Sequence, residues 1–127
     1  MFTLDYPSHI QNEVDRKDVE EISQKVQLYD RINREEKGFD TIIEDRNYLS
    51  GGEIQLVAIA RALIKHPDVM IMDETLASLD EYAAKLVCEI INELAEDKLI
   101  VLISHGRYYD ISASSIVEVK NGTAIQR

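Results

Sequence analysis

Residues 69–105, VMIMDETLASLDEYAAKLVCEIINELAEDKLIVLISH, decide the fold class of this chain. The stretch opens with a short apolar run of the kind found in strands buried on both faces, and Asp73 and Glu74 close that run. Residues 80–96 then place apolar side chains on one broad helical face, and residues 99–103 form a second apolar strand. A helix between two apolar strands predicts a β-α-β unit, and therefore an α/β fold with a parallel sheet.

The sequence on either side of this stretch adds two helices and a hairpin. Residues 15–32 carry apolar side chains at steps of three and four, which predicts one amphipathic helix. A second helix should begin at Ser50, which is followed three residues later by Glu53, and should end before Pro67. Residues 116–126 contain an Asn-Gly pair between two short apolar segments, which predicts a tight β-hairpin.

The composition of the chain excludes several classes of protein. The 127 residues suit one soluble globular domain, and the formal net charge of −10 repels nucleic acid and anionic lipid. The chain has no apolar run near the roughly 18 residues of a membrane-spanning helix and no secretory signal at its start, so we expect a cytosolic chain. Its single cysteine, Cys88, falls in an apolar helical stretch and is expected to be a small buried hydrophobe.

The start of the second helix has two possible meanings. Ser50 and Glu53 alone suit a capping box, in which each side chain binds a backbone N–H at the helix start. The two residues between them, Gly51 and Gly52, would also let an anion such as phosphate approach the free N–H groups of a helix N-terminus. Taken alone, the motif favours the structural interpretation.

The ends of the two predicted strands carry groups that could act chemically. Asp73 and Glu74 suit a strand with an acidic end, or a pair in which one carboxylate holds Mg²⁺ and the other polarises water. His105 follows the second strand and suits a core histidine or a surface group as well as a functional one.

The order and spacing of these motifs are more specific than any one of them. The chain resembles the nucleotide-binding domain of the ATP-binding-cassette family, with signature, Walker B, D-loop and switch-histidine motifs in family order. The motifs are LSGGE at 49–53, VMIMDE at 69–74, SLD at 78–80 and SH at 104–105.

The resemblance implies that the signature acts across an interface. Ser50, Gly51 and Gly52 would contact the γ-phosphate of an ATP held by the opposite subunit. Glu53 stands in the same ATP-binding motif, where the family more often has glutamine. A glutamate near phosphate adds repulsion unless a cap or a counter-ion offsets it.

The other motifs would serve ATP hydrolysis by the same resemblance. Asp73 would match the Walker B aspartate that orients Mg²⁺, and Glu74 the catalytic glutamate that positions the water. His105 would match the switch histidine near the γ-phosphate. Asp80 would match the D-loop, which touches the partner.

The resemblance also implies domains and partners. Residues 1–48 would be part of the helical subdomain, and residues 49–127 the signature, Walker B, D-loop and switch part of the ATPase core. The approach to the signature, residues 38–52, resembles exporter-type members, in which this region faces membrane-spanning transporter domains. A second nucleotide-binding domain and those membrane domains are the expected partners, with no nucleic acid, at the cytoplasmic face of a membrane.

One family motif is absent from the sequence. No glycine is followed by lysine, so the phosphate-binding loop G-x-x-x-x-G-K-[ST] is missing. We therefore expect an incomplete P-loop-NTPase-like three-layer sheet, with apolar strand edges exposed and with marginal stability or association. ATP and Mg²⁺ are expected only in a completed site, so independent hydrolysis is not expected.

Two other functions remain open at this point. The chain could be a catalytically silent interaction module whose signature completes a partner's ATP site. It could also be a nontransport ATPase of the same superfamily, acting on DNA or ribosomes, although its acidity argues against that.

Overall fold

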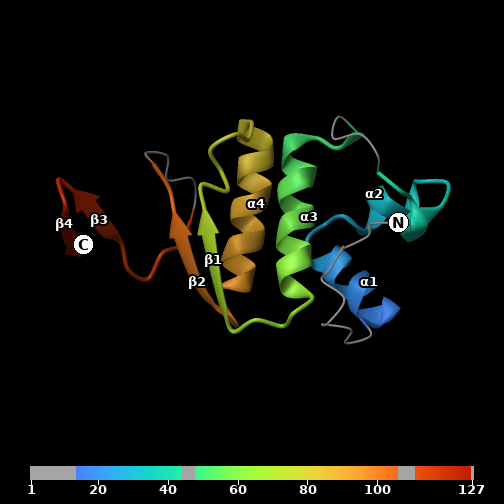
Figure 1. The fold of residues 1–127 in the computed structure, drawn as a ribbon, viewed down its shortest axis with the longest axis horizontal. Coiled ribbons are helices and arrows are strands. Elements are labelled where there is room, and N and C mark those ends of the chain that lie inside the picture. Colours follow the sequence, from blue (N-terminus) through green and yellow to red (C-terminus); the bar gives the residue numbers. More distant parts are fainter. Residues whose placement is uncertain (1–13, 44–47, 106–110, 127) are drawn as a thin grey trace.

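The computed structural model describes residues 14–43, 48–105 and 111–126, and its elements fall into a helical part, a β-α-β part and a hairpin (Figure 1). Residues 1–13 of the predicted helical-subdomain portion and residues 44–47 of the predicted exporter-like approach lie outside the described residues. No described helix is long and apolar enough to cross a membrane. In chain order the elements are α1 (Arg16–Lys25), α2 (Tyr29–Asn33), the 3₁₀ helix η1 (Gly38–Asp40), α3 (Gly51–Leu63), β1 (Val69–Asp73), α4 (Glu81–Leu94), β2 (Leu99–Ile103), β3 (Val117–Lys120) and β4 (Thr123–Gln126).

The single helix predicted over residues 15–32 is wrong, because the chain turns between α1 and α2. Gln27 adopts a left-handed conformation with φ of 57°, and the Leu28 N–H donates to the Ser23 carbonyl at 2.8 Å. Val26 and Leu28 are both buried, with 0% and 4% of their surface exposed. Residues two apart point in different directions on a continuous helix, so the turn lets both side chains enter the core.

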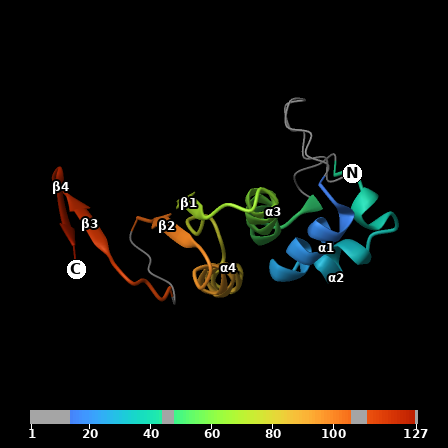
Figure 2. The same cartoon turned by 90° about the horizontal axis from the view of Figure 1, so that it is seen from below.

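The β-α-β unit is confirmed. Strands β1 and β2 pair in parallel, with Val69 opposite Leu99 and Asp73 opposite Ile103, and α4 connects them. Helices α3 and α4 lie side by side and cover one face of this two-stranded sheet (Figures 1 and 2). Their buried side chains form one apolar cluster with Met70 and Met72 of β1.

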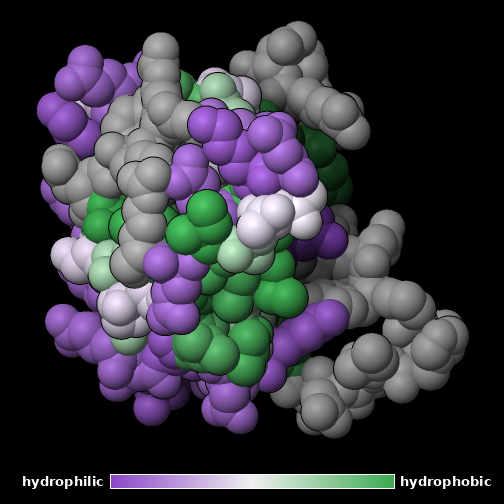
Figure 3. All heavy atoms as spheres, turned by 90° about the vertical axis from the view of Figure 1, so that its left-hand side faces the viewer, coloured by the Kyte–Doolittle hydropathy of each residue, from purple (hydrophilic) through white to green (hydrophobic). Residues whose placement is uncertain are grey.

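The prediction that the first strand is buried on both faces is wrong. Burial alternates along β1, because only the face toward the helices is covered in the described chain. The opposite face exposes apolar side chains on both strands. Figure 3 shows apolar atoms gathered on the side of the molecule that carries the β3–β4 hairpin and β2. The exposed residues are Val69, Ile71, Leu99, Val101 and Ile103. The described residues therefore supply two of the three expected layers.

The C-terminal hairpin is confirmed. Strands β3 and β4 pair antiparallel in a sheet separate from β1 and β2. Asn121 and Gly122 have φ of 51° and 76°, the left-handed pair that a tight two-residue turn requires.

Candidate functional site

The residues predicted for the site lie at one end of the molecule. The first residues of α3 and α4 and the last residues of β1 and β2 all lie at the upper end of Figure 1. The sheet is parallel, so both strands end on the same side. The residues that follow each strand therefore lie at this edge of the sheet. The fold thus brings the four motifs to a common edge.

Glu74 and His105 meet at this edge. The His105 Nε2 atom lies 3.1 Å from the Glu74 Oε1 atom, and 83% and 45% of the two side chains are exposed. The Glu74 N–H donates to the Ile103 carbonyl at 2.9 Å, which extends the pairing of the strands by one residue. Glu74 has φ of 51°, a conformation that is uncommon for a residue with a side chain. The strand ends therefore hold a carboxylate and an imidazole together, open to solvent.

Asp73 is the last residue of β1 and is exposed next to this pair. Carboxylate oxygens suit Mg²⁺, which is usually held by one or two carboxylates together with water and substrate phosphates. No group of three or more potential ligands occurs among the described residues. The donors here thus fit a Mg²⁺ that phosphate oxygens also bind, rather than an ion held by the protein alone.

Helix α3 begins with the predicted capping box. The Glu53 N–H donates to the Ser50 Oγ atom at 3.1 Å, and the Ser50 N–H donates to the Glu53 Oε2 atom at 2.7 Å. The N–H groups of the first two helical residues, Gly51 and Gly52, have no acceptor within the helix, and they donate no hydrogen bond to any of the described residues. The structural interpretation is confirmed, and two donors remain for an anion.

The two glycines differ in what their surroundings require. A Cβ atom added to Gly52 would lie 2.8 Å from the Cβ atom of Ala83, so close packing of α3 on α4 explains this glycine. A Cβ atom added to Gly51 would meet the Leu79 side chain at 3.8 Å and the Ser78 carbonyl at 3.9 Å, which are ordinary contacts. Packing therefore does not require a glycine at position 51. The close approach of a ligand to the backbone would require one.

Asp80 has a structural role at the start of α4. Its side chain accepts a hydrogen bond from the Ala83 N–H at 2.9 Å and caps the helix. The loop before it is held by Leu76 and Leu79, which are 4% and 9% exposed. This loop joins β1 to α4, and its residues Ser78 and Leu79 lie beside Gly51 at the start of α3.

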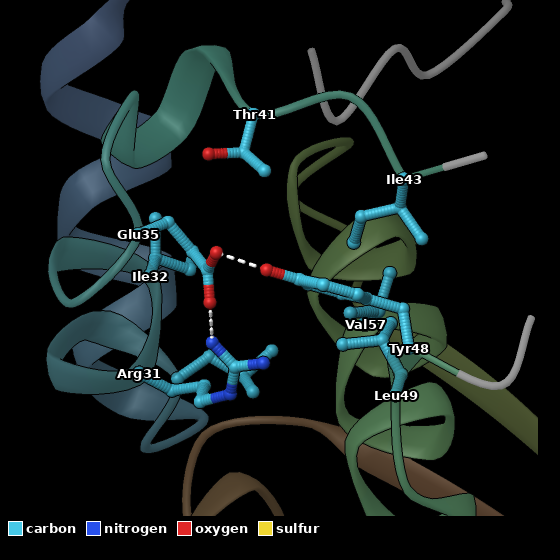
Figure 4. A pocket seen from close by; sticks show the side chains of 9 residues that line it. Arg31, Ile32, Glu35, Thr41, Ile43, Tyr48, Leu49 and Val57 are labelled. Atoms are coloured by element: carbon cyan, nitrogen blue, oxygen red, sulfur yellow. Dashed lines mark hydrogen bonds and ion pairs between the residues drawn. The ribbon is translucent and has the colours of Figure 1, made fainter. Parts of the chain in front are cut away.

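A charged cluster, which sequence reasoning missed, lies behind the start of α3. Arg31 of α2 donates from Nε to the Glu53 Oε1 atom at 3.1 Å and also pairs with Glu35, to which the Tyr48 hydroxyl donates (Figure 4). The hydrogen bonds from Tyr48 and Arg31 lower the pKa of Glu35, and the bond to Glu35 raises the pKa of both Arg31 and Tyr48. Arg31 and Glu53 are 22 residues apart, so no local pattern signals the contact.

The cluster borders a cavity of about 10 Å³ (Figure 4). Thr41 also lines it, and the Thr41 hydroxyl oxygen is buried without a hydrogen-bond partner in the described part of the chain. This volume is at the lower limit for one water molecule and excludes a larger ligand. The cavity is therefore part of the packing around the cluster.

Comparisons with known proteins show the family of the chain. A family model described as "ABC transporter" matches residues 3–77. The chain is 36% identical over 101 residues to "ABC transporter B family member 1" of Dictyostelium discoideum, covering 79% of this chain and 11% of that protein. It is 35% identical over 118 residues to the "ATP-dependent lipid A-core flippase" of Vibrio parahaemolyticus, covering 92% of this chain and 20% of that protein.

A solved structure shows the same fold. The chain is similar to the "Structure of a bacterial Atm1-family ABC exporter with ATP bound", with a TM-score of 0.75 and 28% identity over 91% of this chain and 21% of that one. The first relatives are much longer, and the chain spans between 8% and 20% of their length. The family match and these exporter relatives support the resemblance found in the sequence. The chain belongs to the ABC transporter family and corresponds to part of its nucleotide-binding domain.

Proposed function

We propose that the chain supplies the hydrolytic strand ends and the signature helix of an exporter-type ABC ATPase, which couples ATP hydrolysis to transport across a membrane. The observation that carries the proposal is the 3.1 Å approach of His105 to Glu74 at the ends of two adjacent parallel strands. A second nucleotide-binding domain and membrane-spanning domains are the proposed partners, and the cytoplasmic face of the membrane is the proposed location.

The proposed roles follow from the chemistry of the strand ends. Mg²⁺ neutralises developing phosphate charge in such sites, and Asp73 would help to hold it. The Glu74 carboxylate accepts hydrogen bonds, so it can orient and polarise a water molecule that attacks the γ-phosphate. His105 can donate from Nε2, either to Glu74, as the 3.1 Å distance allows, or to a phosphate oxygen. Neither residue acts until a phosphate-binding loop holds ATP beside them.

The signature helix would act on a different ATP, the one held by the partner. The N–H groups of Gly51 and Gly52 would donate to the γ-phosphate, helped by the partial positive charge of the helix end. The Ser50 Oγ atom accepts from the Glu53 N–H and retains its own hydrogen for donation to phosphate. Asp80, as the cap of α4, would hold the D-loop against the partner.

Reconstitution with a partner domain tests this function. Phosphate release would be measured with a nucleotide-binding domain of the same family that has a phosphate-binding loop but an inactive signature, before and after this chain is added. We expect activity that depends on the chain and is lost in Ser50→Arg, with Glu89→Arg as the control on an exposed position in the middle of α4. In a second assay, a separate segment that carries the phosphate-binding loop and a partner with an intact signature would complete an ATP site beside Glu74, and the activity of that site should be lost in Glu74→Gln.

The pattern of variants distinguishes the possible functions. Activity lost in Ser50→Arg but unchanged in Glu74→Gln would show a catalytically silent module that completes its partner's site. Activity that is unchanged in both variants, or equally reduced by Glu89→Arg, would contradict the proposed function.

A further inference from the structure

Glu53 places a negative charge at the helix end that the proposed function assigns to a phosphate. It is the third residue of α3, and a free carboxylate there would repel the incoming anion. In the structure both of its oxygen atoms are engaged. Oε2 accepts from the Ser50 N–H at 2.7 Å, and Oε1 accepts from the Arg31 Nε atom at 3.1 Å.

Arg31 itself has two further contacts that hold it in place. It pairs with Glu35, and its guanidinium carbon lies 5.5 Å from the centre of the Tyr48 ring. The side chains of Arg31, Glu35 and Glu53 are 32%, 18% and 25% exposed, so water screens them less than it screens fully exposed ion pairs. Arg31 is thus positioned to neutralise Glu53 without occupying the N–H groups of α3.

We infer that Arg31 is a positioning residue of the signature: it fixes and neutralises the Glu53 carboxylate, so that the N–H groups of Gly51 and Gly52 can receive phosphate. This inference rests on the proposed function, because it assigns a role to Arg31 in the same site. It also explains how a glutamate is accommodated at this position. A neutral glutamine at 53 would make Arg31 dispensable for phosphate binding.

A double-mutant cycle tests the inference directly. The affinity for inorganic phosphate would be measured from the NMR shifts of the Gly51 and Gly52 N–H groups in the wild type, Arg31→Met, Glu53→Gln and the double variant. Coupled neighbouring residues usually interact by an amount that corresponds to a few-fold to a hundredfold in affinity, so we expect Arg31→Met to weaken binding about fivefold when residue 53 is Glu. With Gln at 53, we expect less than about a twofold effect.

A control variant excludes a general charge effect. Arg16→Met removes the same charge from an exposed pair with Glu20 and should leave phosphate affinity unchanged. Equal losses from Arg31→Met in both backgrounds, or an equal loss from Arg16→Met, would overturn the inference.

A second readout separates the inference from the proposed function. The Arg31 Nε–H resonance should shift in Glu53→Gln whether or not phosphate binds. If phosphate shifts the N–H resonance of neither glycine in any variant, the proposed phosphate site is wrong, and the role assigned to Arg31 is wrong with it. If phosphate binds but the Arg31 Nε–H resonance does not shift in Glu53→Gln, only the inference about Arg31 is wrong.

Discussion

Replacing Gly52 with alanine should destabilise the chain, whereas the same change at Gly51 should not. The new Cβ atom at 52 would lie 2.8 Å from Ala83 Cβ and 3.8 Å from Ala83 Cα. The Ala83 methyl group has no rotamer that could move it away, so α3 or α4 must shift. At 51 the new Cβ atom would meet Leu79 and Ser78 only at 3.8 Å and 3.9 Å.

Both substitutions gain the higher helix propensity of alanine, but only Gly52→Ala creates a close contact, with Ala83. Alanine is better than glycine in a helix interior by about 1 kcal/mol, and by less in the first turn. Overpacking at a tight contact costs about 1–3 kcal/mol. We therefore expect Gly52→Ala to lower the free energy of unfolding by about 1–2 kcal/mol, and Gly51→Ala to leave it unchanged or raise it by less than about 1 kcal/mol.

Urea denaturation followed by far-UV circular dichroism measures this difference, provided that the slope with urea is the same in the three proteins. Equal stability of the two variants, or a Gly52→Ala protein more stable than the wild type, would refute the proposed close packing of α3 on α4. Gly51→Ala, which retains stability, is then the useful variant for phosphate binding, since its methyl group sits where a ligand would approach.

Three further predictions concern a helix cap, a pH-dependent contact and the sheet face. Asp80→Ala should lower the free energy of unfolding by about 1 kcal/mol and Asp80→Asn by less, because only alanine removes the acceptor that caps α4; urea denaturation of both variants checks this. Glu35 has a pKa below its ordinary value of 4.5, so its stabilising contribution is complete above that pH and is lost as the pH falls through the lower pKa of the folded state. The wild type should therefore exceed Glu35→Gln in stability by less as the pH falls, which urea denaturation at a series of pH values measures. A difference that does not change with pH would contradict the prediction. The apolar sheet face should drive self-association, so Ile71→Lys should reduce the mass measured by sedimentation at high protein concentration. Tyr82→Lys, on the exposed surface of α4, should not reduce it. If the two variants behave alike, this face is not the site of self-association.

Local sequence patterns were sufficient for the β-α-β unit, the capping box and the hairpin. Each depends on residues close in sequence: alternating apolar segments, the Ser50 and Glu53 spacing, and the Asn121–Gly122 pair. Nearby residues dominate the backbone geometry of helix starts and tight turns, so these predictions were confirmed.

Features that depend on tertiary packing were not predictable in this way. The break at Gln27 arises because the core accepts both Val26 and Leu28, which a helical period cannot express. The one-sided burial of β1 depends on what covers the sheet, and an apolar run alone does not indicate this.

The candidate site shows the same division. Sequence order identified Glu74 and His105, and the parallel pairing of their strands explains why they meet. The ion pair between Arg31 and Glu53 joins residues 22 positions apart, so only the fold could reveal it. From the sequence, the glutamate itself indicated only that a cap or a counter-ion would have to offset its charge near phosphate.

The most direct test of the account is Mg-ATP binding and hydrolysis by the purified chain alone, measured by calorimetry and phosphate release. In the proposed function, Asp73, Glu74 and His105 need a phosphate-binding loop that these 127 residues do not contain. We therefore expect no phosphate release, and no binding heat beyond that of a weak phosphate contact at the signature helix, in the wild type and in Glu74→Gln alike. Hydrolysis by the wild type that Glu74→Gln abolishes would contradict this expectation and would require a phosphate site within this chain.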